Sequence, residues 1–77
     1  MKRLSNIPLS EIRRFLERVG CKKIEAKGDH EKWTRADLSR PIIIQQTKNP
    51  PPEFVVKNML RDLGVSRNEF LKIFLEA

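Results

Sequence analysis

Apolar residues near the start of the chain recur every three or four positions and then change to a different spacing. The first pattern, from about Pro8 to Val19, is typical of a helix that buries one face, and Gly20 follows as the residue that ends it. From Lys22 to Lys27 the spacing changes to two, which is typical of a half-buried strand. One face then holds Lys22, Ile24 and Ala26, and the other holds Lys23, Glu25 and Lys27. The pattern therefore predicts a helix followed by a strand.

A second strand is predicted directly after the first. Gly28 and Asp29 form the turn between them, and alternation then runs from His30 to about Arg35. Side chains on a strand point to opposite faces in turn, so we expect one face to hold His30, Lys32 and Thr34 and the other to hold Glu31, Trp33 and Arg35. Trp33 is accordingly expected in the core, on the face opposite His30.

A third strand is predicted from Pro41 to about Gln46, after a polar loop over residues 36–40. Its β-branched residues favour the central or best-covered position in the sheet. Ile42 and Ile44 face one way, and Ile43 and Gln45 face the other.

Two more helices are predicted in the last third of the chain. Three consecutive prolines, at positions 50–52, make a stiff connection into a helix that stops at Gly64, and Ser66 with Glu69 in capping-box spacing opens the final helix. The apolar stripes of these two helices are Val55, Val56, Met59, Leu60 and Leu63, then Phe70, Leu71, Phe74 and Leu75. The order helix, three-stranded antiparallel meander, helix, helix predicts one α+β domain over residues 1–77, with the sheet covered by helices.

Composition points to a polyanionic partner. The 77 residues carry a net charge of +6, and residues 1–35 hold ten of the 16 Lys and Arg against five of the ten Asp and Glu. A chain this short is not expected to enclose a deep cavity, so a site should be a shallow surface on which a polymer can lie. A lone Cys21 excludes an internal disulfide and is expected to be buried, and no segment has the length of a membrane span, so we expect a cytoplasmic protein.

The single histidine, His30, lies in this basic half and is the candidate for proton transfer, because imidazole gains and loses a proton near neutral pH. One histidine and one cysteine do not make a ligand set, so we expect neither a metal nor a cofactor. No helix is basic enough along one face to indicate a reader of DNA grooves.

Several short motifs together resemble the HicA family, small toxins of bacterial and archaeal toxin–antitoxin pairs. They are the helix ending at Gly20, a strand leading into Gly28-x-His30 with an aromatic three residues later, a third strand, and Leu60-Arg61-Asp62-Leu63-Gly64-Val65-Ser66 followed by Glu69-Phe70-Leu71. The resemblance implies a fold similar to a double-stranded-RNA-binding domain, cleavage of mRNA, catalysis by His30, and a HicB-type antitoxin that covers the site. Asp29 stands where the family usually has serine, and the segment 46–52 differs from the usual approach to the second helix.

RNA supplies its own nucleophile, so cleavage needs a base for the 2′-hydroxyl proton and positive charge on the phosphate. We expect His30 to be the general base, with phosphates bound by Lys22, Lys23, Lys27 and Lys32; no acid other than water is identified. Asp29 is a candidate modulator of the His30 pKa, because a nearby carboxylate favours imidazolium; alternatively it caps the turn through its own backbone. The other function class left open is a non-catalytic RNA-binding module of the same shape.

Overall fold

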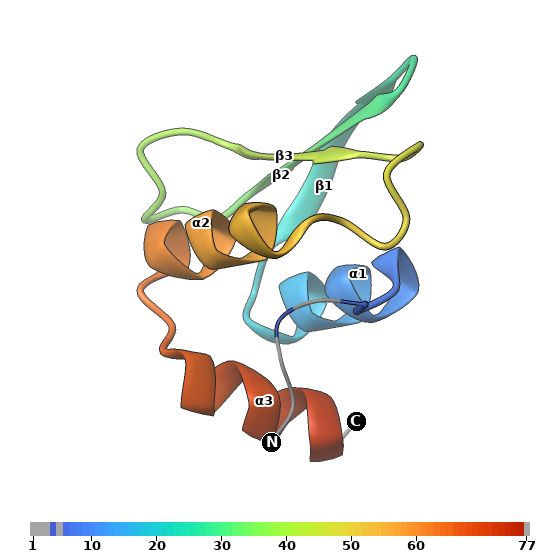
Figure 1. Ribbon diagram of the computed structural model, residues 1–77. Helices are drawn as coiled ribbons and strands as arrows, with labels where there is room; N and C mark the ends of the chain where they lie inside the picture. The colour runs from blue at the N-terminus through green and yellow to red at the C-terminus, as the bar shows by residue number, and fades with distance from the viewer. Residues whose placement is uncertain (1–3, 5, 77) are drawn as a thin grey trace.

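The computed structural model describes residues 4 and 6–76, and the side chains of residues 74–76 lie outside the description. The described residues form α1 (Leu9–Arg18), β1 (Lys22–Lys27), β2 (His30–Thr34), β3 (Ile42–Gln45), α2 (Glu53–Leu63) and α3 (Arg67–Glu76). Figure 1 shows the sheet lying over α1 and α2, with α3 below them on the side away from the sheet. The predicted α+β order of elements is confirmed, whereas the positions expected for the side chains of Phe74 and Leu75 lie outside the described residues.

The strands pair as a meander in the order β1-β2-β3, and both pairings are antiparallel. Of the two positions considered for the third strand, central or best-covered, the central one is wrong, because β2 lies in the middle and β3 lies at one edge. The alternation predicted for β3 is confirmed: Ile42 and Ile44 are buried, and Ile43 is 43% exposed. Its run of isoleucines reflects the burial of one face, where Ile42 and Ile44 lie in the core, and not a central position.

β1 departs most from its predicted pattern, because every residue in it is exposed. Its register with β2 shifts between Lys23 and Glu25, which leaves Ile24 as the extra residue of a β-bulge and 57% exposed. A bulge of this kind bends the strand and interrupts strict alternation. The expectation of a half-buried strand with Lys22, Ile24 and Ala26 on one face is therefore wrong.

The core lies between the helix-facing side of β2 and β3 and the apolar stripes of α1 and α2. The buried face predicted for α1 is confirmed, with Leu9, Ile12, Phe15 and Leu16 in the core. The stripe predicted for α2 is confirmed at Val56, Met59, Leu60 and Leu63, whereas Val55 is only half-buried. Phe70 of α3 is fully buried and contacts Phe15 edge to face, with ring centroids 4.7 Å apart. Cys21 and Trp33 are buried in this core, as expected from the sequence.

Side chains from distant segments complete the helix ends. The Arg35 guanidinium donates to the carbonyl of Val19, 2.9 Å away, and to that of Leu63, 3.3 Å away, so it holds the ends of both α1 and α2. Asn49 Oδ1 accepts a hydrogen bond from the first backbone N–H of α1, that of Leu9. Among the described residues no helix has the length and apolar character to cross a membrane.

Candidate functional site

His30 is the first residue of β2 and follows a two-residue hairpin turn. Gly28 takes a positive φ of 59°, which suits the first central position of a type II′ turn, and Asp29 occupies the second. The backbone register places His30 between Lys27 of β1 and Gln45 of β3. Residues paired across antiparallel strands share a face, so these three side chains form one row on the side of the sheet away from the helices.

Asp29 ties the hairpin turn to the segment that follows β3. One carboxylate oxygen accepts from the Thr47 backbone N–H at 2.8 Å, and the other accepts from the Thr47 hydroxyl at 2.9 Å. The Asp29 carbonyl also accepts from the N–H of Gln46 at 2.7 Å. The hydrogen bonds from the Thr47 side chain and backbone lower the pKa of Asp29, with a smaller contribution from the charge of His30. The carboxylate thus bridges two segments, a contact that the sequence did not predict.

The uncovered face of the sheet gathers three of the four candidate phosphate ligands. Lys27 is in the row of His30, Lys32 is two residues along β2, and Lys22 is paired with Thr34 at the far end. Lys32 Nζ lies 3.5 Å from Glu25 Oε1, an exposed ion pair that costs little to exchange for a phosphate. His30 itself is exposed.

Lys23 is not part of this group. It pairs with Trp33, whose side chain is buried on the helix side of the sheet, and its charge contributes to lowering the pKa of the buried Glu31. The bulge inserts one extra residue between Lys23 and Glu25, so the alternation of faces shifts at that point. Lys27 therefore lies on the same face as His30, and Lys23 does not. Lys23 is therefore on the opposite face from the other three candidate lysines.

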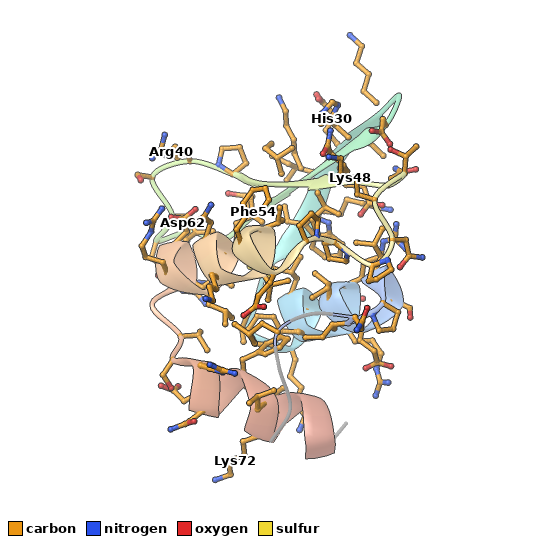
Figure 2. The ribbon with its side chains drawn as sticks, viewed as in Figure 1. His30, Arg40, Lys48, Phe54, Asp62 and Lys72 are labelled. Atoms are coloured by element: carbon orange, nitrogen blue, oxygen red, sulfur yellow. The ribbon has the colours of Figure 1, made fainter. Side chains whose placement is uncertain are left out.

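A groove of about 450 Å³ runs between β3 and α2 and reaches His30. Figure 2 shows Lys48 near His30 at one end of β3, and Arg40 with Asp62 at the other. Its lining includes Ile43, Gln45, Val55 and Met59. Sequence reasoning missed Arg40 and Lys48 as site residues; the available signal was that they flank the third strand on either side.

Beneath the open face, an ion pair between a buried carboxylate and a half-exposed guanidinium connects β2 to α1. Glu31 is 2% exposed and accepts from the Arg13 guanidinium, with Nη2 and Oε2 2.5 Å apart, and from Trp33 Nε1 at 3.0 Å. The hydrogen bonds from Arg13 lower the pKa of Glu31, while burial acts in the opposite direction. The strand that carries His30 is thereby anchored on its other face by a residue next to His30 in the sequence.

The chemistry available at the open face is that of one imidazole among cations. A histidine can accept or donate a proton near neutral pH, and the surrounding lysines can offset the charge of a bound phosphate. No three His, Cys, Asp or Glu side chains within the described part of the chain converge as a metal site would require. Comparison of the chain with family models, with curated proteins and with solved structures finds no match.

Proposed function

We propose that this protein is a metal-independent endoribonuclease that cleaves mRNA, with His30 as its catalytic residue. The observation that carries the proposal is the position of His30: it is exposed on the uncovered face of the sheet, in register with Lys27, on a strand anchored from its other face by Glu31. This arrangement holds a proton acceptor at a fixed place on a cationic surface.

The proposed reaction uses the 2′-hydroxyl of RNA as nucleophile. His30 takes the proton from this hydroxyl as its oxygen bonds to the adjacent phosphorus, and the bond from phosphorus to the 5′-oxygen breaks. Water protonates the leaving 5′-oxygen, and the other product ends in a 2′,3′-cyclic phosphate. Lys27, with Lys32 and Lys22 along the same face, offsets the charge on the phosphate oxygens in the transition state.

The resemblance to HicA supports placing the protein among toxins of type II toxin–antitoxin pairs, acting in the cytoplasm and neutralised by a HicB-type antitoxin. The helix, three-stranded meander and helix order is also the basis for proposing a fold similar to a double-stranded-RNA-binding domain. The competing function is a non-catalytic RNA-binding module, which would bind RNA and leave it uncut.

The test is cleavage of a single-stranded RNA by the purified protein in the presence of EDTA, with product ends identified by mass spectrometry. We expect 2′,3′-cyclic phosphate ends, and we expect His30→Ala to reduce cleavage by at least about 10²-fold. The alanine variant, purified in the same way, also controls for contaminating nucleases.

Amide NMR spectra of both proteins would establish that the fold is unchanged, as expected for an exposed side chain. A folded His30→Ala protein that cuts at the wild-type rate would contradict the catalytic assignment. RNA that is bound by both proteins and cut by neither would favour the binding module.

A further inference from the structure

The two edge strands of the sheet differ in how well they are protected against pairing with a strand of another chain. β1 carries Lys22, Lys23 and Lys27 and contains the bulge at Ile24, and lysines and bulges are features that keep an edge strand from pairing with another chain. β3, at the opposite edge, consists of three isoleucines and a glutamine in unbroken register with β2. It therefore lacks both protections.

The groove follows the free edge of β3. Ile42 and Ile44 point toward the helices, Ile43 and Gln45 point to the open face, and all four line the groove. Side chains from both faces of a strand can line one groove only where the groove runs along the edge of that strand. Within the described residues no other strand pairs with this edge, so its outward N–H and C=O groups lack strand partners.

The far wall and the ends of the groove indicate what fits there. The far wall is α2, which contributes Val55 and Met59, and Phe54 on the same helix is 65% exposed and rises toward β3 in Figure 2. Arg40 precedes β3 and Lys48 follows it, so each end of the strand carries a cation. Asp62 is the one acidic residue in the described lining.

We propose that this groove binds an extended, acidic segment of a partner protein, which adds a strand to β3. Apolar side chains on one face of the segment would pack against Val55 and Met59 of α2, and the alternating carboxylates on its other face would lie beside Ile43 and face Arg40 and Lys48. The ladder would span the four residues of β3, or about 14 Å. This inference does not rest on the proposed ribonuclease activity.

Two other occupants fit less well. A second copy of this chain, paired antiparallel along β3, would bring Arg40 of one copy toward Lys48 of the other, and like charges would oppose the pairing. RNA matches the charge, but its sugar–phosphate backbone does not continue a β-ladder. Both are retained as outcomes of the experiment.

The experiment is an NMR titration of the full ¹⁵N-labelled chain with a capped peptide of three Glu-Val repeats. We expect shifts concentrated at Ile42–Gln45 and along α2, and slower hydrogen exchange at amides of β3 as the ladder forms. The same peptide N-methylated at all six residues keeps charge and apolar surface but loses every backbone donor, and we expect it to bind about tenfold more weakly.

Matched variants test the edge. Ile43→Glu places an acid in the groove and is expected to weaken the Glu-Val peptide by about tenfold. Ile24→Glu makes the same change at an exposed isoleucine on the other edge and is expected to leave binding unchanged. Ile43 is on the open face, so neither variant removes a buried side chain.

Several outcomes would overturn the proposal. Absence of shifts, shifts confined to β1, or equal binding of the N-methylated peptide would each exclude strand addition at β3. Shifts along β3 caused by an RNA hexamer with 2′-O-methyl groups, and not by the peptide, would make the groove an RNA site. Dimerisation that Ile43→Glu abolishes, measured by sedimentation, would identify a second copy as the occupant.

Discussion

Successive residues of β2 point to opposite faces of the sheet, and the two faces differ in burial and in the contacts that they make. On the helix side, Glu31 and Trp33 are 2% and 4% exposed, hydrogen-bonded to each other, and locked to α1 through Arg13. On the open side, His30 and Lys32 face solvent, and their neighbours on the adjoining strands are Lys27, Glu25 and Gln45, together with the exposed Ile43. One strand therefore anchors the fold and presents the site.

Because the two faces differ in burial, we expect substitutions on them to affect different properties of the protein. A change on the helix side removes packing or leaves a buried charge unpaired, so it should lower the free energy of unfolding. A change on the open side removes groups that water already solvates, so it should alter binding or chemistry while stability stays nearly constant. Neighbouring positions on β2 can thus separate folding from function.

The largest effect is expected at Trp33. Trp33→Ala removes a large buried side chain and a hydrogen bond to Glu31, so we expect a loss of about 3–5 kcal/mol in the free energy of unfolding. Lys32→Ala, next to it on the open face, is the matched control and should change stability by less than about 0.5 kcal/mol. Urea unfolding followed by circular dichroism measures both. Similar losses in the two variants would mean that β2 is not divided into an anchoring face and a solvent face.

The ion pair between Arg13 and Glu31 should have the next largest effect. Arg13 is 35% exposed, so the pair is only partly shielded from water, and we expect Arg13→Ala to cost about 1–3 kcal/mol at neutral pH. Arg14→Ala breaks the exposed pair with Glu11 on the same helix and should cost less than about 0.5 kcal/mol.

The cost of Arg13→Ala should also depend on pH. Folding lowers the pKa of Glu31 below its ordinary value of 4.5, so the stabilisation is fully present above that value and is lost as the pH falls through the folded pKa. The difference between wild type and Arg13→Ala should therefore shrink below about pH 4.5, in urea unfolding repeated between about pH 3 and 7. A constant difference across this range would show that Arg13 acts through packing of its side chain alone.

A smaller effect is expected where the two faces meet, at the turn before β2. Asp29→Ala removes both hydrogen bonds to Thr47, and we expect faster hydrogen exchange at the Thr47 amide and slower RNA cleavage, because His30 follows the turn directly. Thr47→Val removes only the hydroxyl, so it should give a milder form of the same change. The double variant should be no worse than Asp29→Ala, since both act through one contact. Additive losses in cleavage would assign Asp29 a separate role at His30.

Local patterns predicted much of this architecture. The stripes of α1 and α2, the alternation of β2 and β3, and the burial of Trp33 opposite His30 each follow from spacing within one segment. The same reasoning gave a wrong prediction for β1. A bulge at Ile24 changes which residues share a face, and the alternation of residue types does not reveal a bulge.

The remaining features depend on contacts between segments far apart in the chain. Arg35 at the ends of two helices, and Asp29 with Thr47, are joined by the fold and have no local signature. Arg40 and Lys48 were visible as charges, but their place beside a groove depends on β3 being an edge strand. The apolar composition of β3 predicts a central or best-covered strand; it reflects the burial of one face and does not determine the position of the strand in the sheet.

The smallest expected effect is on the salt dependence of RNA affinity when lysines are replaced, and it tests directly whether the open face is the one that binds phosphates. Lys27 and Lys32 share the face of His30, whereas Lys23 is on the opposite face and Lys72 is on α3, far from the sheet in Figure 2. RNA affinity should fall with salt at a logarithmic slope of about −0.7 for each phosphate neutralised on a single strand. We expect the Lys27→Gln, Lys32→Gln double variant to flatten this slope and the Lys23→Gln, Lys72→Gln double variant to leave it unchanged. The two proteins have the same net charge, so a difference between them reports position and not overall attraction. If the salt slope were flattened equally in both variants, RNA binding would depend on the total charge of the molecule. The open face of β2 would then not be the phosphate-binding surface.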